Sequence, residues 1–261
     1  MLEALILGII QGITEFIPVS SSGHLILAPQ LLDMQEHSTA FDVMLHGGTL
    51  LALLLYYRKY LFRLLTRIFQ ERQAQIFVAK ILIAIIPAGI IGFLFEERID
   101  ELFKSNLIVA FMLISIGLLM IVADYVYKSR KREEEVESTS IRQAFLVGIL
   151  HPLSLIRGTS RSGITILAGL SQGMSLKQAT NFSFLIGIPL IAGAVLSHFI
   201  GLLQGDLIEE SISQLAVGFV AAFVSGLIAI DFMLNKINKF GLRLFGIYRI
   251  ILGIFVIIML L

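Results

Sequence analysis

The chain has 261 residues and a formal net charge of +1, with 57% apolar residues, 15% charged residues and a mean hydropathy of +0.90. Soluble domains contain roughly 25% charged residues, so the composition excludes a soluble domain and indicates an all-α integral membrane protein. The absence of cysteine excludes disulfides, thiolate metal sites and cysteine nucleophiles, and no basic patch indicates binding of nucleic acid.

The first segment in chain order, about Leu2–Leu32, consists of a short apolar run, a polar interruption and a second short apolar run. Its first run, Ala4–Ile13, is shorter than the ~20 residues that a spanning helix needs. We therefore expect a re-entrant helix-loop-helix that enters the membrane and leaves on the same side. Irregular backbone at that depth is tolerated only where protein buries it or where it lines a wet cavity.

The interruption in this segment reads QGITEFIPVSSSGH and places ionisable side chains in apolar sequence. Gln11 and Glu15 lie four residues apart and share one face of a helix, which Pro18 is expected to end. His24 follows beyond the proline. Ionisable groups at membrane depth indicate a functional site. The single carboxylate of Glu15 suits Mg²⁺ or Ca²⁺ held jointly with substrate phosphates.

A run of small residues separates the proline from the histidine. Successive backbone N–H groups in such a turn point at an anion, and the N-terminus of a following helix adds to the attraction. Close packing between helices is the competing interpretation of such a Ser/Gly run when the run is considered by itself. The residues predicted to contact substrate here are Ser20, Ser21, Ser22 and Gly23.

Three segments that follow are long and apolar enough to span a bilayer. They are about Phe41–Tyr57, Ile76–Phe95 and Leu107–Tyr127. His46, in the first of them, is interpreted either as a hydrogen-bonded structural histidine or as an outer partner of the site. The charged stretch 128–143 is interpreted as a cytoplasmic linker between a first repeat, 1–127, and a second repeat, 144–261, of one membrane domain.

The second interrupted segment, about Ala144–Met174, contains the cationic sequence IRGTSRSG. Arginine is always charged, and its planar fork matches phosphate oxygens bidentately. We therefore predict that Arg161 binds a phosphate group of the substrate. The neighbours predicted to assist it are Ser160, Ser162 and Gly163.

Three more apolar segments complete a set of six predicted spans. They are about Phe182–Leu203, Leu215–Leu234 and Leu244–Leu261. The most basic connecting segments fall on one side of this layout, and the positive-inside rule places that side in the cytoplasm. These basic segments are Arg58–Arg72, Lys128–Arg142 and Asn235–Arg243.

The two interrupted segments are copies of one another. Displaced by 140 residues, Ala4–Ala28 aligns with Ala144–Ala168 without a gap, and nine of the 25 positions are identical. In the layout above, the first copy enters from outside and the second from inside. This arrangement predicts inverted-topology repeats with a site at their interface. The superposition places Arg161 opposite Ser21, so that a guanidinium and a hydroxyl face one cavity.

The interrupted cores and the stretch NFSFLIGIPLIAGA resemble the BacA-type undecaprenyl-diphosphatase family over essentially the whole chain. The resemblance implies hydrolysis of undecaprenyl diphosphate to undecaprenyl phosphate and inorganic phosphate in bacterial peptidoglycan synthesis, with a link to bacitracin resistance. It implies a divalent cation and a site on the outer side of the bacterial inner membrane. The family's (Glu/Gln)-x-x-x-Glu element falls on Gln11 and Glu15, and its serine, histidine and arginine fall on Ser21, His24 and Arg161.

Two positions depart from the family pattern. Arg157–Gly158 stands where the family usually has Pro-Gly, and His151–Pro152 stands where it usually has Gln-Ala. Both departures lie in the second core.

The hypothesis for catalysis makes Ser21 the nucleophile and His24 its base. In the alternative, His24 activates a water and Ser21 only orients the phosphate. A rival class is a transporter or flippase of a lipid phosphate, because inverted repeats with broken helices are also transporter architecture. The expected partners are a polyprenyl diphosphate and membrane lipid, with a homodimer left open.

Overall fold

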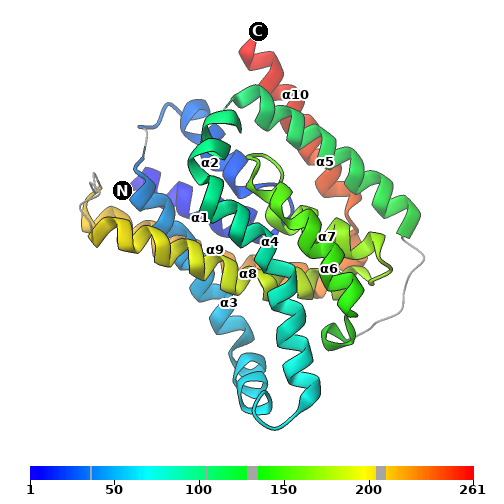
Figure 1. Cartoon of the computed structure of the whole chain (residues 1–261). Coiled ribbons are helices and arrows are strands. Elements are labelled where there is room, and N and C mark those ends of the chain that lie inside the picture. The colour runs from blue at the N-terminus through cyan, green and yellow to red at the C-terminus, as the bar shows by residue number, and fades with distance from the viewer. Residues whose placement is uncertain (36, 104, 128–134, 204–209) are drawn as a thin grey trace.

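The computed structural model describes residues 1–35, 37–103, 105–127, 135–203 and 210–261 (Figure 1). All regular secondary structure in these residues is helical, which confirms the predicted all-α class. Residues 128–134 of the predicted linker lie outside the described residues. The elements are α1 (Leu2–Phe16), α2 (Ser21–Leu31), α3 (Thr39–Arg67), α4 (Arg72–Phe103), α5 (Asn106–Tyr127), the short 3₁₀ helix η1 (Val136–Ser138), α6 (Ile141–Leu150), a second 3₁₀ helix η2 (His151–Leu155), α7 (Arg161–Ser171), α8 (Leu176–Leu203), α9 (Ile212–Phe240) and α10 (Arg243–Leu260).

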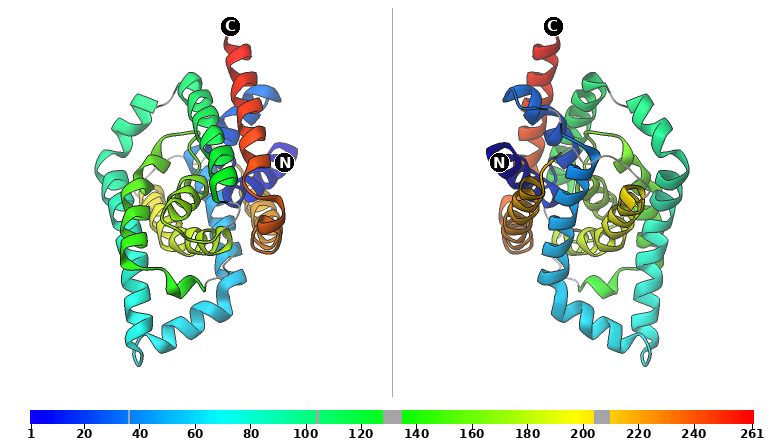
Figure 2. Two further views of the ribbon diagram at one scale, coloured as in Figure 1. Left: turned by 90° about the vertical axis from the view of Figure 1, so that its right-hand side faces the viewer. Right: turned by 90° about the vertical axis from the view of Figure 1, so that its left-hand side faces the viewer.

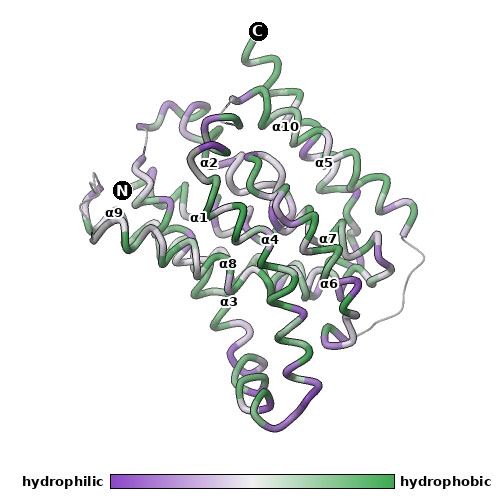
Figure 3. Tube along the Cα trace, viewed as in Figure 1, coloured by the Kyte–Doolittle hydropathy of each residue, from purple (hydrophilic) through white to green (hydrophobic). Residues whose placement is uncertain are grey.

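Six helices in the described part of the chain, α3, α4, α5, α8, α9 and α10, are long and apolar enough to cross a membrane. They contain the six predicted spans except for the final residue, Leu261, so the prediction of a multi-pass membrane protein with six helices able to span the bilayer is confirmed. Figure 3 shows apolar residues along most of their length and polar residues where α3 turns into α4.

Two of the three basic segments predicted as connecting loops, Arg58–Arg72 and Asn235–Arg243, are mostly helical. Helix α3 continues to Arg67 and α9 to Phe240, both past the predicted span ends. The added turns contain neither Gly nor Pro, and Lys and Arg are good helix formers whose aliphatic stems cover apolar surface. Gly241, which has φ of 68°, is the C-cap of α9, and Asp124 of α5 accepts the N–H of Leu242 at 2.8 Å.

The two interrupted segments each form a helix, a break and a second helix. Helix α1 ends at Phe16, just before Pro18, as predicted. Helix α7 begins 140 residues after α2. The N-cap residues Ser20 and Ser160 have positive φ values of 80° and 74°, and each accepts an N–H three residues ahead in the sequence. The two copies therefore share a local backbone geometry that residues other than glycine seldom adopt.

The first helix of each interrupted segment packs against a span from the other half of the chain. Helix α1 lies along α9, and α6 lies along α4 (Figures 1 and 2). Small residues permit close approach between helices in membranes: Gly8 faces Gly218 and Ala221, and the equivalent Gly148 faces Ile83 and Ala84. Helices α5 and α10 pack against one another beside both breaks (Figure 2).

Candidate active site between two broken helices

Glu15, on the last turn of α1, joins the two breaks. Its Oε1 accepts a hydrogen bond from Nη2 of Arg161 at 2.8 Å, and its Oε2 accepts one from Oγ of Ser21 at 2.8 Å. Nε2 of Gln11 also donates to Oε2, at 3.2 Å. A buried carboxylate is tolerated where it is paired and hydrogen-bonded. The structure thus brings together the acid, hydroxyl, amide and guanidinium that the sequence indicated.

The guanidinium of Arg161 is held on a second side by α8. Its Nη1 donates to the carbonyl of Ser183 at 2.8 Å, while Nη2 binds Glu15. Gly187 of α8 lies directly behind the guanidinium, and a Cβ at this position would overlap it. The fork of Arg161 is therefore fixed in orientation before any substrate binds.

The serines predicted to contact substrate cap the helices and connect the breaks. Oγ of Ser162 donates to the carbonyl of Glu15 at 3.3 Å, and the equivalent Ser22 accepts the N–H of Gly158 at 3.5 Å. Each serine thus bonds the backbone of the other copy, and in both bonds the donor belongs to the second copy. The other predicted contacts form the caps: Gly23 N–H donates to Ser20 Oγ, and Gly163 N–H donates to Ser160 Oγ.

The caps leave the N–H groups at the start of α2 and α7 available. Ser21 and Ser22 open α2, and Arg161 and Ser162 open α7. Such first-turn N–H groups have no acceptor within their own helix, and the helix dipole favours an anion there. The site therefore combines two helix N-termini, one from each half of the chain.

His24 has two hydrogen-bond partners, and neither of them is Ser21. Its Nδ1 lies 2.7 Å from the carbonyl of Ser20, and its Nε2 lies 2.7 Å from the hydroxyl of Tyr248 on α10. A carbonyl only accepts, so Nδ1 is the donor, and in the neutral ring Nε2 accepts from Tyr248. The two rings also stack. The hydroxyl of Ser21 donates to Glu15 instead, so the geometry makes Glu15 the acceptor for the Ser21 proton.

His46 of α3 lies near Glu15, but beyond hydrogen-bond distance of it. Its Nε2 lies 3.9 Å from Oε2 of Glu15, and its Nδ1 bonds the carbonyl of Asp42 at 2.8 Å. The structural hydrogen bond is therefore present, and the ring also faces the carboxylate.

Arg249 of α10 is a residue that the sequence interpretation missed. Its side chain is fully buried and reaches the carbonyls of Pro18 in the first break and of Gly158 and Thr159 in the second. A charged residue in the middle of an apolar span is the signal that could have identified it. Tyr248, beside it, gave no comparable signal.

The polar atoms of the first core fit a divalent cation that arrives with phosphate. In the described part of the chain, no three His, Asp or Glu side chains gather around one point. Oε1 of Gln11 is buried without a hydrogen-bond partner, because Nε2 faces Glu15. An amide oxygen beside one carboxylate leaves most positions around a Mg²⁺ ion for water and substrate phosphates, which is its usual arrangement.

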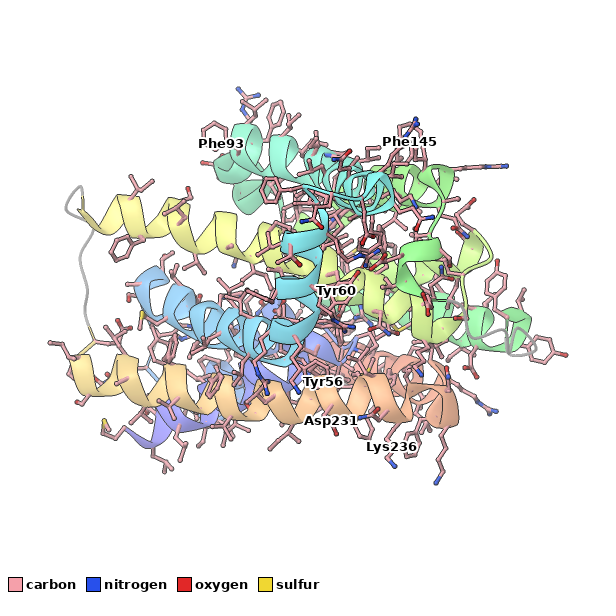
Figure 4. All side chains as sticks on the ribbon, turned by 90° about the horizontal axis from the view of Figure 1, so that it is seen from below. Tyr56, Tyr60, Phe93, Phe145, Asp231 and Lys236 are labelled. Carbon is pink, nitrogen blue, oxygen red and sulfur yellow. The ribbon has the colours of Figure 1, made fainter. Side chains whose placement is uncertain are left out.

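A separate cavity of about 500 Å³ lies at the far end of α3 and shares no residue with this site. Figure 4 shows Tyr60 at this end of α3, and Tyr56 next to Asp231 of α9. The charged groups of the cavity are partly paired with one another, since Arg67 binds both Glu71 and Glu137. The cavity is lined by Tyr60, Arg63, Arg67, Glu135, Val136, Glu137, Lys177 and Asn181.

The fold and the site define a multi-pass helical membrane protein with a buried acid, a partly buried serine and a partly buried arginine between two broken helices. The family model described as "Bacitracin resistance protein BacA" matches residues 4–255. The chain belongs to this family.

Curated relatives match along almost the whole chain. An undecaprenyl-diphosphatase of Christiangramia forsetii is 39% identical, with 98% of this chain and 97% of the relative covered. One from Alteromonas mediterranea is 40% identical, with 97% and 96% covered. One from Bacillus velezensis is 36% identical, with 99% and 98% covered.

Proposed function

We propose that this protein hydrolyses undecaprenyl diphosphate to undecaprenyl phosphate and inorganic phosphate, and thereby recycles the lipid carrier of peptidoglycan synthesis. The observation that carries the proposal is the contact of Ser21 and Arg161 with the same carboxylate, Glu15. The relatives named undecaprenyl-diphosphatase support the same reaction and favour an enzyme over a transporter or flippase.

The proposed reaction transfers the terminal phosphoryl group to Ser21. Oγ of Ser21 attacks the terminal phosphorus and passes its proton to Oε2 of Glu15, 2.8 Å away. The bond from that phosphorus to the bridging oxygen breaks, and undecaprenyl phosphate leaves with the electron pair. Water then attacks the phosphorus of the phosphoserine, and the bond from that phosphorus to Oγ of Ser21 breaks. The Oγ takes back the proton held by Glu15, so inorganic phosphate is released and both the hydroxyl and the carboxylate are restored.

Arg161 stabilises the charge that develops on the phosphoryl group. In the resting site, its guanidinium is paired with Glu15. Protonation of Glu15 removes that negative partner, so the fork of Arg161 becomes available to the phosphoryl oxygens at the moment of transfer. The N-termini of α2 and α7 add N–H groups to the same region. Phosphoryl transfer depends mainly on such positioning and electrostatic stabilisation.

Gln11 and Glu15 would hold the divalent cation, Mg²⁺ or Ca²⁺, through Oε1 of the amide and the carboxylate. When bound with the diphosphate, such an ion supplies positive charge that the substrate oxygens share. Because Arg161 already balances the charge of Glu15, the cation should bind together with the substrate rather than before it.

The proposal also includes two re-entrant segments, α1–α2 and α6–α7, in inverted-topology repeats, with the site facing the outer side of the inner membrane. Two observations support it. The breaks share one geometry at Ser20 and Ser160, and each first helix packs on a span of the other half. The distribution of Lys and Arg between the two sides supports the orientation.

Release of inorganic phosphate from undecaprenyl diphosphate by the purified protein in detergent tests this function. We expect steady turnover that a chelator lowers and added Mg²⁺ or Ca²⁺ restores. Ser21→Ala and Arg161→Ala should lose at least about 100-fold in kcat while keeping the thermal unfolding of the parent protein. A folded protein that releases no phosphate, but moves a labelled lipid phosphate across liposomes, would show a carrier instead.

A rapid-quench measurement shows whether Ser21 or a water molecule is the nucleophile. A phosphoserine at residue 21 is expected within the first turnover. Retention of activity by Ser21→Ala would show that water attacks directly, with Ser21 as an orienting group.

A further inference from the structure

Arg249 binds carbonyl groups from three separate parts of the chain. Nη1 donates to Pro18 at 3.3 Å, and Nη2 donates to Gly158 at 2.7 Å and to Thr159 at 3.1 Å. Nε and Nη2 also reach carbonyls of α5, those of Leu113 and Met112, at 3.4 and 3.3 Å. One guanidinium therefore connects α10, α5 and both breaks.

These bonds account for the carbonyl groups that the breaks leave without helical partners. Pro18 lies between α1 and α2, and Gly158 and Thr159 lie just before α7. Buried backbone carbonyls need donors, and no water is available at membrane depth. A guanidinium presents five N–H donors in a fixed plane, whereas a lysine ammonium is a compact charge with three.

Arg249 does not serve as a ligand for the substrate. Its side chain has no exposed surface, and its nitrogens are directed at backbone carbonyls. Within the described residues it pairs with no carboxylate. A buried charge without a counter-ion costs free energy. Here the carbonyl dipoles of the two breaks compensate the charge of Arg249. Moving the breaks apart would remove that compensation and destabilise the fold.

We propose that Arg249 is a positioning residue that fixes the separation of the two breaks, and through it the meeting of Ser21 and Arg161 at Glu15. This inference rests on the proposed phosphatase function only for its kinetic test. Its structural content, one guanidinium that holds two breaks together, is independent of the reaction.

The kinetic test compares Arg249→Lys with the parent protein in the phosphate-release assay. Because misplacement of a reacting group by about 1 Å costs roughly 100-fold in rate, we expect kcat to fall about 10- to 100-fold. KM should change less than about threefold, since Arg249 does not touch the substrate.

Val256→Ala is the matched control. Val256 is buried on α10 and packs with Val109 and Leu113 of α5, so its truncation weakens the α5–α10 interface without changing Arg249. We expect lower thermal stability with kcat retained. An equal loss of kcat in Val256→Ala and Arg249→Lys, or a folded Arg249→Lys with kcat within twofold of the parent, would overturn the proposal.

A distance measurement tests the same inference without any activity. The chain has no cysteine, so spin labels can be placed on Ile13→Cys and Leu153→Cys, two exposed and repeat-equivalent positions that flank the breaks. We expect one narrow distance distribution with Arg249 and a broadened or shifted one with Arg249→Lys or Arg249→Met. An unchanged distribution in a folded variant contradicts the proposal. If the parent protein released no phosphate but Arg249→Lys or Arg249→Met still broadened the distribution, the proposed function would fail and the role of Arg249 would stand.

Discussion

At the scale of single residues, the orientation of Arg161 depends on a glycine that carries no polar group. Gly187 of α8 leaves the space in which the guanidinium lies, and that guanidinium is tied to both Ser183 and Glu15. A methyl group at residue 187 would overlap the guanidinium, so one of these two hydrogen bonds has to break.

Gly187→Ala is therefore expected to lower kcat about 10- to 100-fold, the range found when a catalytic group is misplaced. Stability should not fall from the helix itself, because Ala is the better helix former by about 1 kcal/mol. Gly193→Ala is the matched control on the same helix, since a Cβ there would have no neighbour within 4 Å. Steady-state kinetics of both variants check the prediction, and equal activity of the two would contradict it.

At the scale of elements, the short helix η1 is attached to the C-terminal end of α3. The carboxylate of Glu137 accepts hydrogen bonds from Nη1 and Nη2 of Arg67 at 3.0 and 3.2 Å and from the hydroxyl of Tyr60 at 3.1 Å. Nζ of Lys80 on α4 donates to the backbone carbonyl of the same residue. The described end of the predicted linker is thus bound to the first half of the chain rather than solvated.

Glu137→Ala should lower the midpoint of thermal unfolding in detergent. The lost hydrogen bond from Tyr60 alone contributes about 1 kcal/mol, and Arg67 keeps only its pairing with Glu71. The control is Glu135→Ala, whose side chain is exposed nearby. If both variants unfold at the same temperature as the parent protein, the attachment contributes nothing to stability.

A second attachment joins the start of α3 to the start of α9. Glu210 accepts hydrogen bonds from the N–H and the hydroxyl of Ser38, which is the N-cap of α3. Partial burial would raise the pKa of Glu210, but these hydrogen bonds outweigh it and hold the pKa below the ordinary value of 4.5. The charged carboxylate is therefore the form that stabilises the fold.

This shift predicts how stability varies with pH. Well above pH 4.5, Glu210 is charged in the folded and unfolded chain alike, and its stabilising contribution is complete. As the pH falls below 4.5, the unfolded chain takes up the proton first, so that contribution is lost progressively toward the lower pKa of the folded chain. Unfolding midpoints between pH 3.5 and 7 should therefore fall less steeply in Glu210→Gln than in the parent protein. Glu101→Gln, at an exposed acid on α4, serves as the control and should follow the parent.

At the scale of the whole molecule, the architecture could be predicted from the sequence more completely than the contacts between residues could. Hydropathy placed the six spans because a spanning helix needs an apolar stretch of fixed length. The 140-residue repeat related α2 to α7 because each copy keeps a Ser-x-Ser-Gly start. Glu15 and Arg161 were identified because charges are rare at membrane depth.

What the sequence did not predict are contacts between distant parts of the chain. The bond between His24 and Tyr248 and the reach of Arg249 to Pro18 depend on how α10 packs beside the breaks. No local pattern encodes that packing. The interpretation of His24 as the base for Ser21 relied on their spacing of three residues, but its ring turns to Ser20 and Tyr248, and Glu15 takes the hydroxyl.

The inverted arrangement of the two halves makes a prediction for the whole molecule that labelling can test. If α1–α2 is re-entrant from outside, then Glu3→Cys and Gln35→Cys react from the outer side of intact cells with a reagent that does not cross membranes. If α6–α7 is re-entrant from inside, then Ser140→Cys and Ser171→Cys react only after the cells are permeabilised, as Gln70→Cys between α3 and α4 should. All five positions are exposed, and the parent protein has no cysteine to give background. Accessibility of Glu3→Cys and Gln35→Cys from opposite sides would mean that α1–α2 crosses the bilayer, so the two halves would not be inverted copies and the site could not lie at the interface of such repeats.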